Sequence, residues 1–353
     1  MIKPFFMSGF FPMHDDTQVA RVFEMQKSLK DGMFPVRWTA DLGYNYGYPI
    51  FNFYAPFAYY VGGFLGLTGL DSLSATKIMM AIGIVLSGLT MYLFAKQFWG
   101  IGGGIISALL YLYAPYHALD IYVRGDVAEF WAYAFIPIIF YGLWMAFHKQ
   151  NWFYVIIGSL GYTAVIISHN LSAMMITPFI MLFILVLLFF SWKIKDSKKI
   201  YYPFLILLFG IILAAFYWLP VFSEMKYTNV LSQVGGGADY RDHFVCPVQL
   251  WSSPWGFGGS APGCVDGLSF KLGKIHIGIF LLAVLSLFLW RKSEKEKFYL
   301  GVLISLFVLF SVFLTFSQSQ FIWDAITPMA FLQYPWRFLL LAAFFMSFVG
   351  GAI

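Results

Sequence analysis

Leu171-Ser-Ala-Met-Met-Ile-Thr-Pro-Phe-Ile-Met-Leu-Phe-Ile-Leu-Val-Leu-Leu-Phe-Phe-Ser-Trp192 is a run of 22 residues without one ionisable side chain. An α-helix needs about 20 apolar residues to cross the hydrocarbon core of a bilayer. The run therefore predicts a transmembrane helix, and the rest of the chain repeats its character.

The composition places the whole chain among polytopic membrane proteins. Hydrophobic residues make up 60% of it and charged residues 11%, the mean hydropathy is +0.76, and there are 41 Phe, 22 Tyr and 12 Trp. Such values lie outside the range of soluble globular domains. The net charge of +5 is small and no basic patch interleaved with aromatics occurs, so the partner that we expect is the lipid bilayer and not nucleic acid.

Apolar runs long enough to span recur along the sequence and predict an all-α polytopic membrane protein with about nine transmembrane helices. Lys and Arg gather in every second connection, which the positive-inside rule assigns to the cytoplasm. The intervening segments, 1–71 and 222–274, are then extracytoplasmic, and they flank helical regions at 72–221 and 275–353. The predicted spans are 72–96, 101–118, 127–147, 152–168, 171–192, 200–221, 275–290, 298–316 and 337–353.

Segment 51–67 is apolar enough to be taken for another span, but Pro56, its glycines and its tyrosines favour a segment that lies in the membrane interface. We therefore expect interfacial helices within 1–71. The chain begins abruptly, and its last apolar run, 338–353, stops without a charged flank. Both features indicate a fragment or a trimmed protein.

The first extracytoplasmic segment contains a concentrated acidic group, Pro12-Met-His-Asp-Asp-Thr-Gln-Val19, ahead of an amphipathic stretch that ends at Gly32. One carboxylate can cap the helix expected from near Thr17, while the other points at a ligand. Asp16 is the favoured cap and Asp15 the favoured catalyst, and a shift of one residue in the helix boundary would exchange these roles.

Three further polar positions fall at predicted helix ends on the same side. Asp126 and Glu129 have the spacing of an N-capping box. Arg124 is suited to bidentate phosphate binding, or else pairs with Asp120, with Asp126 or with lipid headgroups. His169-Asn170 form a very tight turn, in which Asn170 can simply cap the next helix.

Arg337 and a tyrosine-rich run allow both a structural and a functional interpretation. Arg337 follows Trp336 at the start of the last run, as an interfacial anchor or as a holder of phosphate. Tyr46 belongs to the aromatic run 44–54, which can be an interfacial belt or a stacking wall for a sugar.

Cysteine and histidine usage adds two expectations. Cys246 and Cys264, the only cysteines, both lie in the long outer segment, which predicts a disulfide between them. No two of the six histidines have zinc-site spacing, so the sequence supports no histidine metal site.

The polar motifs carry a resemblance to a known family. The chain resembles bacterial integral membrane proteins described as 6-pyruvoyl-tetrahydropterin synthase-related and, more broadly, the type-C (GT-C) glycosyltransferase superfamily. Nothing in it resembles the zinc-histidine arrangement of a soluble pterin synthase. Superfamily members usually have a helix before the acidic loop, which again indicates truncation. The motifs are His14-Asp15-Asp16, Gly43-Tyr-Asn-Tyr-Gly-Tyr-Pro49, Phe51-Asn-Phe-Tyr54, Tyr113-Ala-Pro-Tyr-His117 to Tyr122-Val-Arg-Gly125, Ser168-His-Asn170 and Tyr334-Pro-Trp-Arg337.

The resemblance implies transfer of a sugar from a polyprenyl-phosphate donor to an acceptor at the outer face of the bacterial cytoplasmic membrane. Asp15 or Asp16 would be the general base, and Arg124 and Arg337 would stabilise the phosphate leaving group. The aspartates could instead hold a divalent cation, Mg or Mn. The remaining candidates for substrate binding are His14, Tyr46, His169 and Asn170.

Two other functions remain open. A transporter or lipid flippase would be expected to place ionisable residues at the bilayer midplane, whereas here they gather at outer helix ends. A catalytically silent protein of envelope assembly could keep the same fold.

Overall fold

The computed structural model describes residues 1–193, 201–229, 232, 234–291 and 294–353. Across these residues it contains helices and no strand, apart from an isolated bridge between Thr39 and Tyr48. The prediction of an all-α fold is confirmed. The principal helices are α1 (Gln18–Lys30), α2 (Ile50–Phe53), α3 (Phe57–Leu67), α4 (Ser72–Leu112), α5 (Pro115–Leu119), α6 (Val127–Lys149), α7 (Trp152–Ser168), α8 (Asn170–Lys193), α9 (Tyr201–Leu213), α10 (Ala215–Glu224), α11 (Pro247–Trp251), α12 (Lys274–Trp290), α13 (Lys295–Phe313), α14 (Gln320–Ala325) and α15 (Leu339–Gly350).

Helix α4 is two limbs joined at Gly100, whose φ of 72° and ψ of −171° are not helical. A Cβ added at Gly104 would lie 2.9 Å from the Cβ of Lys96, and one at Gly88 would lie 2.8 Å from the Leu112 side chain. The limbs therefore run back along each other, as the separate predictions for 72–96 and 101–118 require. The second limb ends at Leu112, so the prediction that it continues to 118 is wrong, because Pro115 starts the separate helix α5.

Among the described residues, four helices are long and apolar enough to cross a membrane: α4, α6, α8 and α13. A fifth is added if α9 and α10, which meet at a bend of 59°, are taken as one span. Helices α7 and α12 and the segment Pro335–Gly350 are shorter apolar helices. The structure thus supports a polytopic membrane protein, while the number nine stays a prediction.

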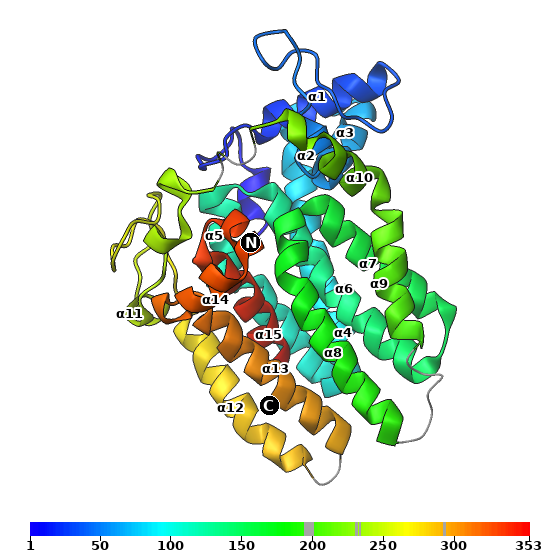
Figure 1. The fold of residues 1–353 in the computed structure, drawn as a ribbon, viewed down its shortest axis with the longest axis vertical. Helices are drawn as coiled ribbons and strands as arrows, with labels where there is room; N and C mark the ends of the chain where they lie inside the picture. Colours follow the sequence, from blue (N-terminus) through cyan, green and yellow to red (C-terminus); the bar gives the residue numbers. More distant parts are fainter. Residues whose placement is uncertain (194–200, 230–231, 233, 292–293) are drawn as a thin grey trace.

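Helices α2 and α3 form the segment for which we predicted an interfacial position. The 11 residues of α3 rise only about 16 Å, roughly half of the hydrocarbon thickness. Gly62 and Gly63 let α3 approach α1, because a Cβ at either would lie 2.7 Å from a side-chain atom of Val22 or Met25. Figure 1 shows α1, α2 and α3 together at the top of the molecule, away from the C-terminus.

The core of the bundle lies around α6 and α15. Every residue of α15 is buried, and its Phe344 and Phe348 stack on Phe94 of α4. Helices α6 and α7 touch through glycine, since a Cβ at Gly142 would lie 2.4 Å from the Cα of Gly158. Small residues allow such close approach between helices in membranes.

The long segment after α10 contains the disulfide predicted from the sequence. Cys246 and Cys264 are bonded, with their Cα atoms 5.5 Å apart. The Lys-rich connections at 194–200 and 292–293, which carry much of the orientation argument, lie outside the described residues.

Candidate active site

Backbone contacts join the first outer segment to the turn before α6. Asp120–Arg124 form one π-helical turn, η2, and Gly125 follows with a left-handed φ of 66°. A Cβ at Gly125 would lie 2.2 Å from the sulfur of Met13, so only glycine permits this approach. The amides of His14 and Asp15 donate to the carbonyls of Val123 and Arg124 at 2.8 and 2.9 Å. These bonds fix the acidic motif beside Arg124.

Arg124 is buried among three carboxylates. Its guanidinium nitrogens lie 2.5 Å from Asp120, 2.8 Å from Asp126 and 2.9 Å from Glu129. The ring of Trp336 covers its face, with 4.7 Å between the guanidinium carbon and the ring centroid. Pairing with Asp120 and Asp126, the structural alternative stated above for Arg124, is therefore what the structure shows.

Asp126 caps α6, as the sequence predicts: the Glu129 amide donates to Asp126 Oδ1 at 3.1 Å. The Glu129 side chain does not complete the capping box. It contacts Arg124 instead and accepts a hydrogen bond from the hydroxyl of Tyr116. Burial opposes ionisation of Asp126, but the positive charges of Arg124, His169 and Arg337 lower its pKa to about 2.

Arg337 approaches the same group from the 3₁₀ turn η10 (Pro335–Phe338), just before α15. Only 8% of the residue is exposed, yet its Nε and Nη1 have no hydrogen-bond partner. Oε2 of Glu129 is 3.7 Å from Nε, beyond hydrogen-bond distance, and is already paired with Arg124 Nη1 at 2.9 Å. Buried donors without partners are costly, so the surroundings of Arg337 are incomplete.

His169 completes the group from the tight turn between α7 and α8, which the structure confirms. Its Nδ1 lies 2.8 Å from the Ser172 hydroxyl and accepts from the Ser172 amide at 3.3 Å. Burial lowers the pKa of His169. One ligand atom each of His169, Asp126 and Glu129 lies within 4.8 Å of the others, a set of buried donors that suits a cation.

The adjacent aspartates have different surroundings. Asp15 is half-buried, and burial, followed by the charge of Asp126, raises its pKa. Asp16 is exposed. The prediction that Asp16 caps the first helix is wrong: the N-cap of α1 is Thr17, and its side chain makes no capping hydrogen bond. The helix begins one residue later than the capping geometry of Asp16 would need.

The other predicted residues lie further from the ion group. His14 is exposed, and its Nε2 is 2.8 Å from the carbonyl oxygen of Phe257 in the long outer segment. Asn170 is exposed, and its side chain accepts from the Leu171 amide at 3.0 Å. His169, the residue before α8, accepts a second bond from the first turn of that helix, from the Ser172 amide at 3.3 Å. Tyr46 is 89% exposed at the tip of its loop.

The sequence patterns did not predict that Glu129, Asp120 and Tyr116 belong to the candidate site. The sequence predicts Glu129 only as a capping partner, Asp120 only as a partner for Arg124, and Tyr116 only as part of a motif. The available signal is the density of charge, since four charged residues fall within 120–129 of a chain that is only 11% charged.

An apolar groove of about 400 Å³ lies between α7, α8, α9 and α10, beside the turn that holds His169. It reaches from Asn170 to Tyr162 and Tyr217, and Tyr162 and Thr177 bond to each other at 2.7 Å within it. The groove therefore runs along the apolar helices from Asn170, the residue that follows His169.

Helical architecture, apolar spans and a charged group at helix ends define a polytopic membrane protein. A family model described as "6-pyruvoyl-tetrahydropterin synthase related domain; membrane protein" matches residues 51–233, more than half of the chain. The chain belongs to this family. An uncharacterised protein of Lactococcus lactis subsp. cremoris is 23% identical over 236 residues, which cover 63% of this chain and 38% of that protein.

Solved structures of the oligosaccharyltransferase of Archaeoglobus fulgidus share the fold. The apo form superposes with a TM-score of 0.57 at 15% identity, covering 98% of this chain and 47% of that one. The complex of that enzyme, AglB, with an inhibitory peptide and a dolichol-phosphate gives 0.58 at 14% identity, covering 99% and 47%. These superpositions show a shared fold, and this chain spans about half of the archaeal protein.

Proposed function

We propose that the chain transfers a sugar from a polyprenyl-phosphate donor to an acceptor at the outer face of the bacterial cytoplasmic membrane. The observation that carries the proposal is Arg337, a buried guanidinium with two unpartnered N–H groups that lies beside carboxylates at helix ends. A phosphate oxygen is the natural acceptor for such a donor. The shared fold with an oligosaccharyltransferase supports the same conclusion.

The proposal assigns a binding position to both parts of the donor lipid, the phosphate and the isoprenoid chain. Its phosphate would accept from Nε and Nη1 of Arg337, and its isoprenoid chain would follow the apolar groove below Asn170. Arg124 already has three carboxylate partners, so its main role is to hold those carboxylates in position. Its charge still adds to the attraction for phosphate.

Asp15 is the residue that we assign as general base. The acceptor hydroxyl oxygen bonds to the anomeric carbon, the bond from that carbon to the phosphate oxygen breaks, and its electron pair stays on the phosphate. The hydroxyl proton passes to the Asp15 carboxylate. The raised pKa of Asp15 suits this role, because a base works best when its pKa approaches the working pH. Asp16 is exposed and serves no step.

Asp126, Glu129 and His169 would hold a divalent cation, Mg or Mn, and the structure offers a fit. One ligand atom of each residue lies within 4.8 Å of the others, and carboxylate oxygens and imidazole nitrogens are ligands that divalent cations accept. Such an ion supplies positive charge to the leaving phosphate.

The transporter alternative fits the geometry less well. Asp126 is at the N-cap of α6, His169 lies between α7 and α8, and Arg337 precedes α15. The group thus lies at helix ends, whereas a transport pathway would place ionisable residues in mid-membrane.

The experiment is sugar transfer by the purified full-length protein in lipid nanodiscs, with a panel of polyprenyl-phosphate hexoses as donors. Asp15→Asn is expected to lower the rate by about 10² to 10⁴-fold, and Asp16→Asn is the matched control that keeps it within about twofold. A chelator should suppress transfer and added Mn should restore it. An active parent with both variants at full rate would refute the mechanism, and an inactive parent would favour the silent-protein alternative.

Sidedness is tested separately by cysteine labelling in intact cells. Thr228→Cys, exposed in the long outer segment, should react with an impermeant maleimide, and Lys149→Cys at the end of α6 should not. Labelling of the second position would move the site to the cytoplasmic face.

A further inference from the structure

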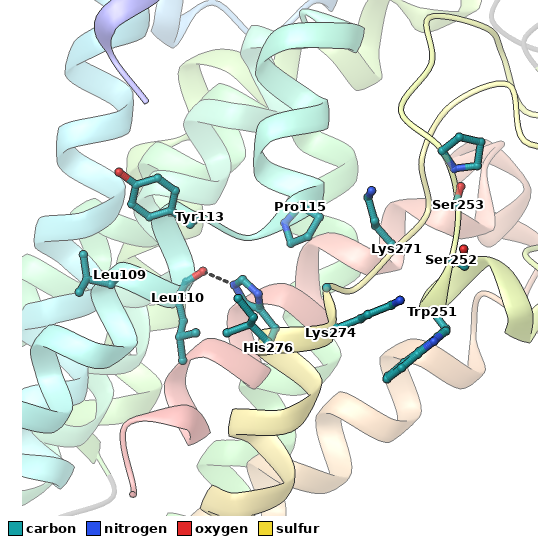
Figure 2. Close-up of a pocket in the computed structure, with 13 residues that line it drawn as sticks. Leu109, Leu110, Tyr113, Pro115, Trp251, Ser252, Ser253, Lys271, Lys274 and His276 are labelled. Atoms are coloured by element: carbon teal, nitrogen blue, oxygen red, sulfur yellow. Dashed lines mark hydrogen bonds between the residues drawn. The ribbon is translucent and has the colours of Figure 1, made fainter.

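A second pocket, of about 790 Å³, lies where the end of α4 and the start of α5 face α11 and the start of α12. Figure 2 shows Lys271 and Lys274 between Pro115 and the segment Trp251–Ser253. His276 Nε2 lies 2.8 Å from the carbonyl oxygen of Leu110, which ties α12 to α4 and fixes the wall between them. This volume is within the range of small-molecule sites.

The charges of this pocket are positive and uncompensated. Within the described residues, no carboxylate lies within the ion-pair distance of 4.0 Å from either lysine. Lys274 Nζ lies 5.2 Å from the centroid of the Trp251 ring. Two ammonium groups in one pocket therefore lack a counter-ion.

The position of Lys274 makes this arrangement less favourable still. It is the first residue of α12, a helix of 17 residues with no acidic residue in its first turn and no side-chain cap. The N-terminus of a helix carries partial positive charge and disfavours a cation. The predicted orientation also places both lysines on the outer side, where the positive-inside rule disfavours them. An anion in the pocket would relieve all three conflicts.

Apart from Ser252, Ser253 and His276, the rest of the lining is mainly apolar, and much of it is exposed. Leu109, Tyr113 and Ile275 are 51%, 60% and 73% exposed. Leu109 is on the second limb of α4 and Ile275 on α12, so the apolar surface continues down two helices from the lysines. A small inorganic anion would leave this apolar surface exposed, whereas the hydrocarbon chains of a lipid phosphate would cover it.

We propose that this pocket binds the phosphate of an anionic glycerophospholipid from the surrounding membrane leaflet. The lysines contact the phosphate, and the acyl chains lie along Leu109 and Ile275. The site is separate from the ion group: Pro115 lines the pocket, while the next residue, Tyr116, bonds to Glu129 on the other side of α5. The proposal does not depend on glycosyl transfer.

The test measures binding of dioctanoyl phosphatidylglycerol to the purified protein in detergent by native mass spectrometry. Dioctanoyl phosphatidylcholine and inorganic phosphate are the comparison ligands. The double variant Lys271→Gln/Lys274→Gln is expected to bind phosphatidylglycerol roughly tenfold to thirtyfold more weakly, the factor that two lysine contacts with membrane phosphate supply.

Two variants separate the pocket from general charge and from folding. Lys226→Gln is the matched control, because Lys226 is also an exposed lysine over an aromatic ring, 5.0 Å from Tyr227; it should leave binding unchanged. Lys271→Arg/Lys274→Arg keeps both charges and should retain binding, which shows that loss in the Gln variant is not misfolding.

Three results would overturn the proposal. One is equal binding of phosphatidylglycerol by the parent and the Lys→Gln double variant. Another is equal loss in Lys226→Gln, which would mean general attraction to anionic lipid. The third is lysine-dependent binding of inorganic phosphate as tight as that of the lipid, which would make the ligand a free anion.

Discussion

Arg124 and Arg337 are both buried and both face Glu129, but their surroundings differ in completeness. Arg124 has Asp120, Asp126 and Glu129 within 2.9 Å and donates to the Tyr116 hydroxyl at 3.1 Å. Arg337 has one carboxylate oxygen at 3.7 Å and two nitrogens without partners. The comparison indicates that a buried arginine whose N–H donors are paired with carboxylates stabilises the fold, whereas one with unpaired donors is available to bind a ligand.

The largest effect should come from Arg124. Arg124→Met leaves three carboxylates without their shared cation, and breaking a buried ion pair in this way costs about 3–5 kcal/mol. Urea or thermal unfolding of the purified protein in detergent would measure the loss. Arg337→Met is the matched variant and should cost far less, because it removes two unsatisfied donors; equal losses would remove the distinction between the two arginines.

The second effect should be on rate and should come from Arg337. Arg337→Met should lower sugar transfer by about 10² to 10³-fold, the usual cost of one donor to developing negative charge. Arg241→Met, at an exposed arginine of the outer segment, is the control and should keep its rate. If the Arg337 variant transferred sugar at the parental rate, the unpaired N–H groups of Arg337 would have no role in catalysis.

The smallest effect should be a pH dependence of the free energy of unfolding, which arises from Asp126. Its folded pKa of about 2 lies below that of the unfolded chain, near 4. It therefore contributes about 2.7 kcal/mol to the free energy of unfolding, which is present above pH 4 and lost as the pH falls through 2. Metal-free protein unfolded between pH 2 and 5 should show this slope, and Asp126→Asn, which keeps the cap, should flatten it. An unchanged slope would mean that Arg124 does not hold Asp126 ionised.

Much of the fold could be predicted from local patterns. Apolar length found α6 and α8, the spacing of Asp126 and Glu129 found the cap of α6, and shared location found the disulfide. Rules based on neighbouring residues in the sequence failed where contacts between distant parts of the chain determine the local structure. They assigned a cap to Asp16, although the first outer segment is held by backbone bonds to Val123 and Arg124.

Local sequence patterns could not predict the assembled site, because Glu129 and Arg337 are 208 residues apart in the chain. Nothing near either residue indicates that they meet. The sequence could indicate each as unusual by its charge, and the helical topology alone brings them together.

The complete burial of α15 has a consequence for biosynthesis. This helix and Arg337 before it are among the last parts of the described chain to be made, yet they occupy its centre. A ribosome-bound chain that has not reached residue 337 can assemble Arg124 with its carboxylates but has no Arg337 to receive phosphate. If the chain acts as proposed, it would hold donor phosphate only after α15 has entered the bundle, so the order of synthesis would delay use of the donor until this core is assembled.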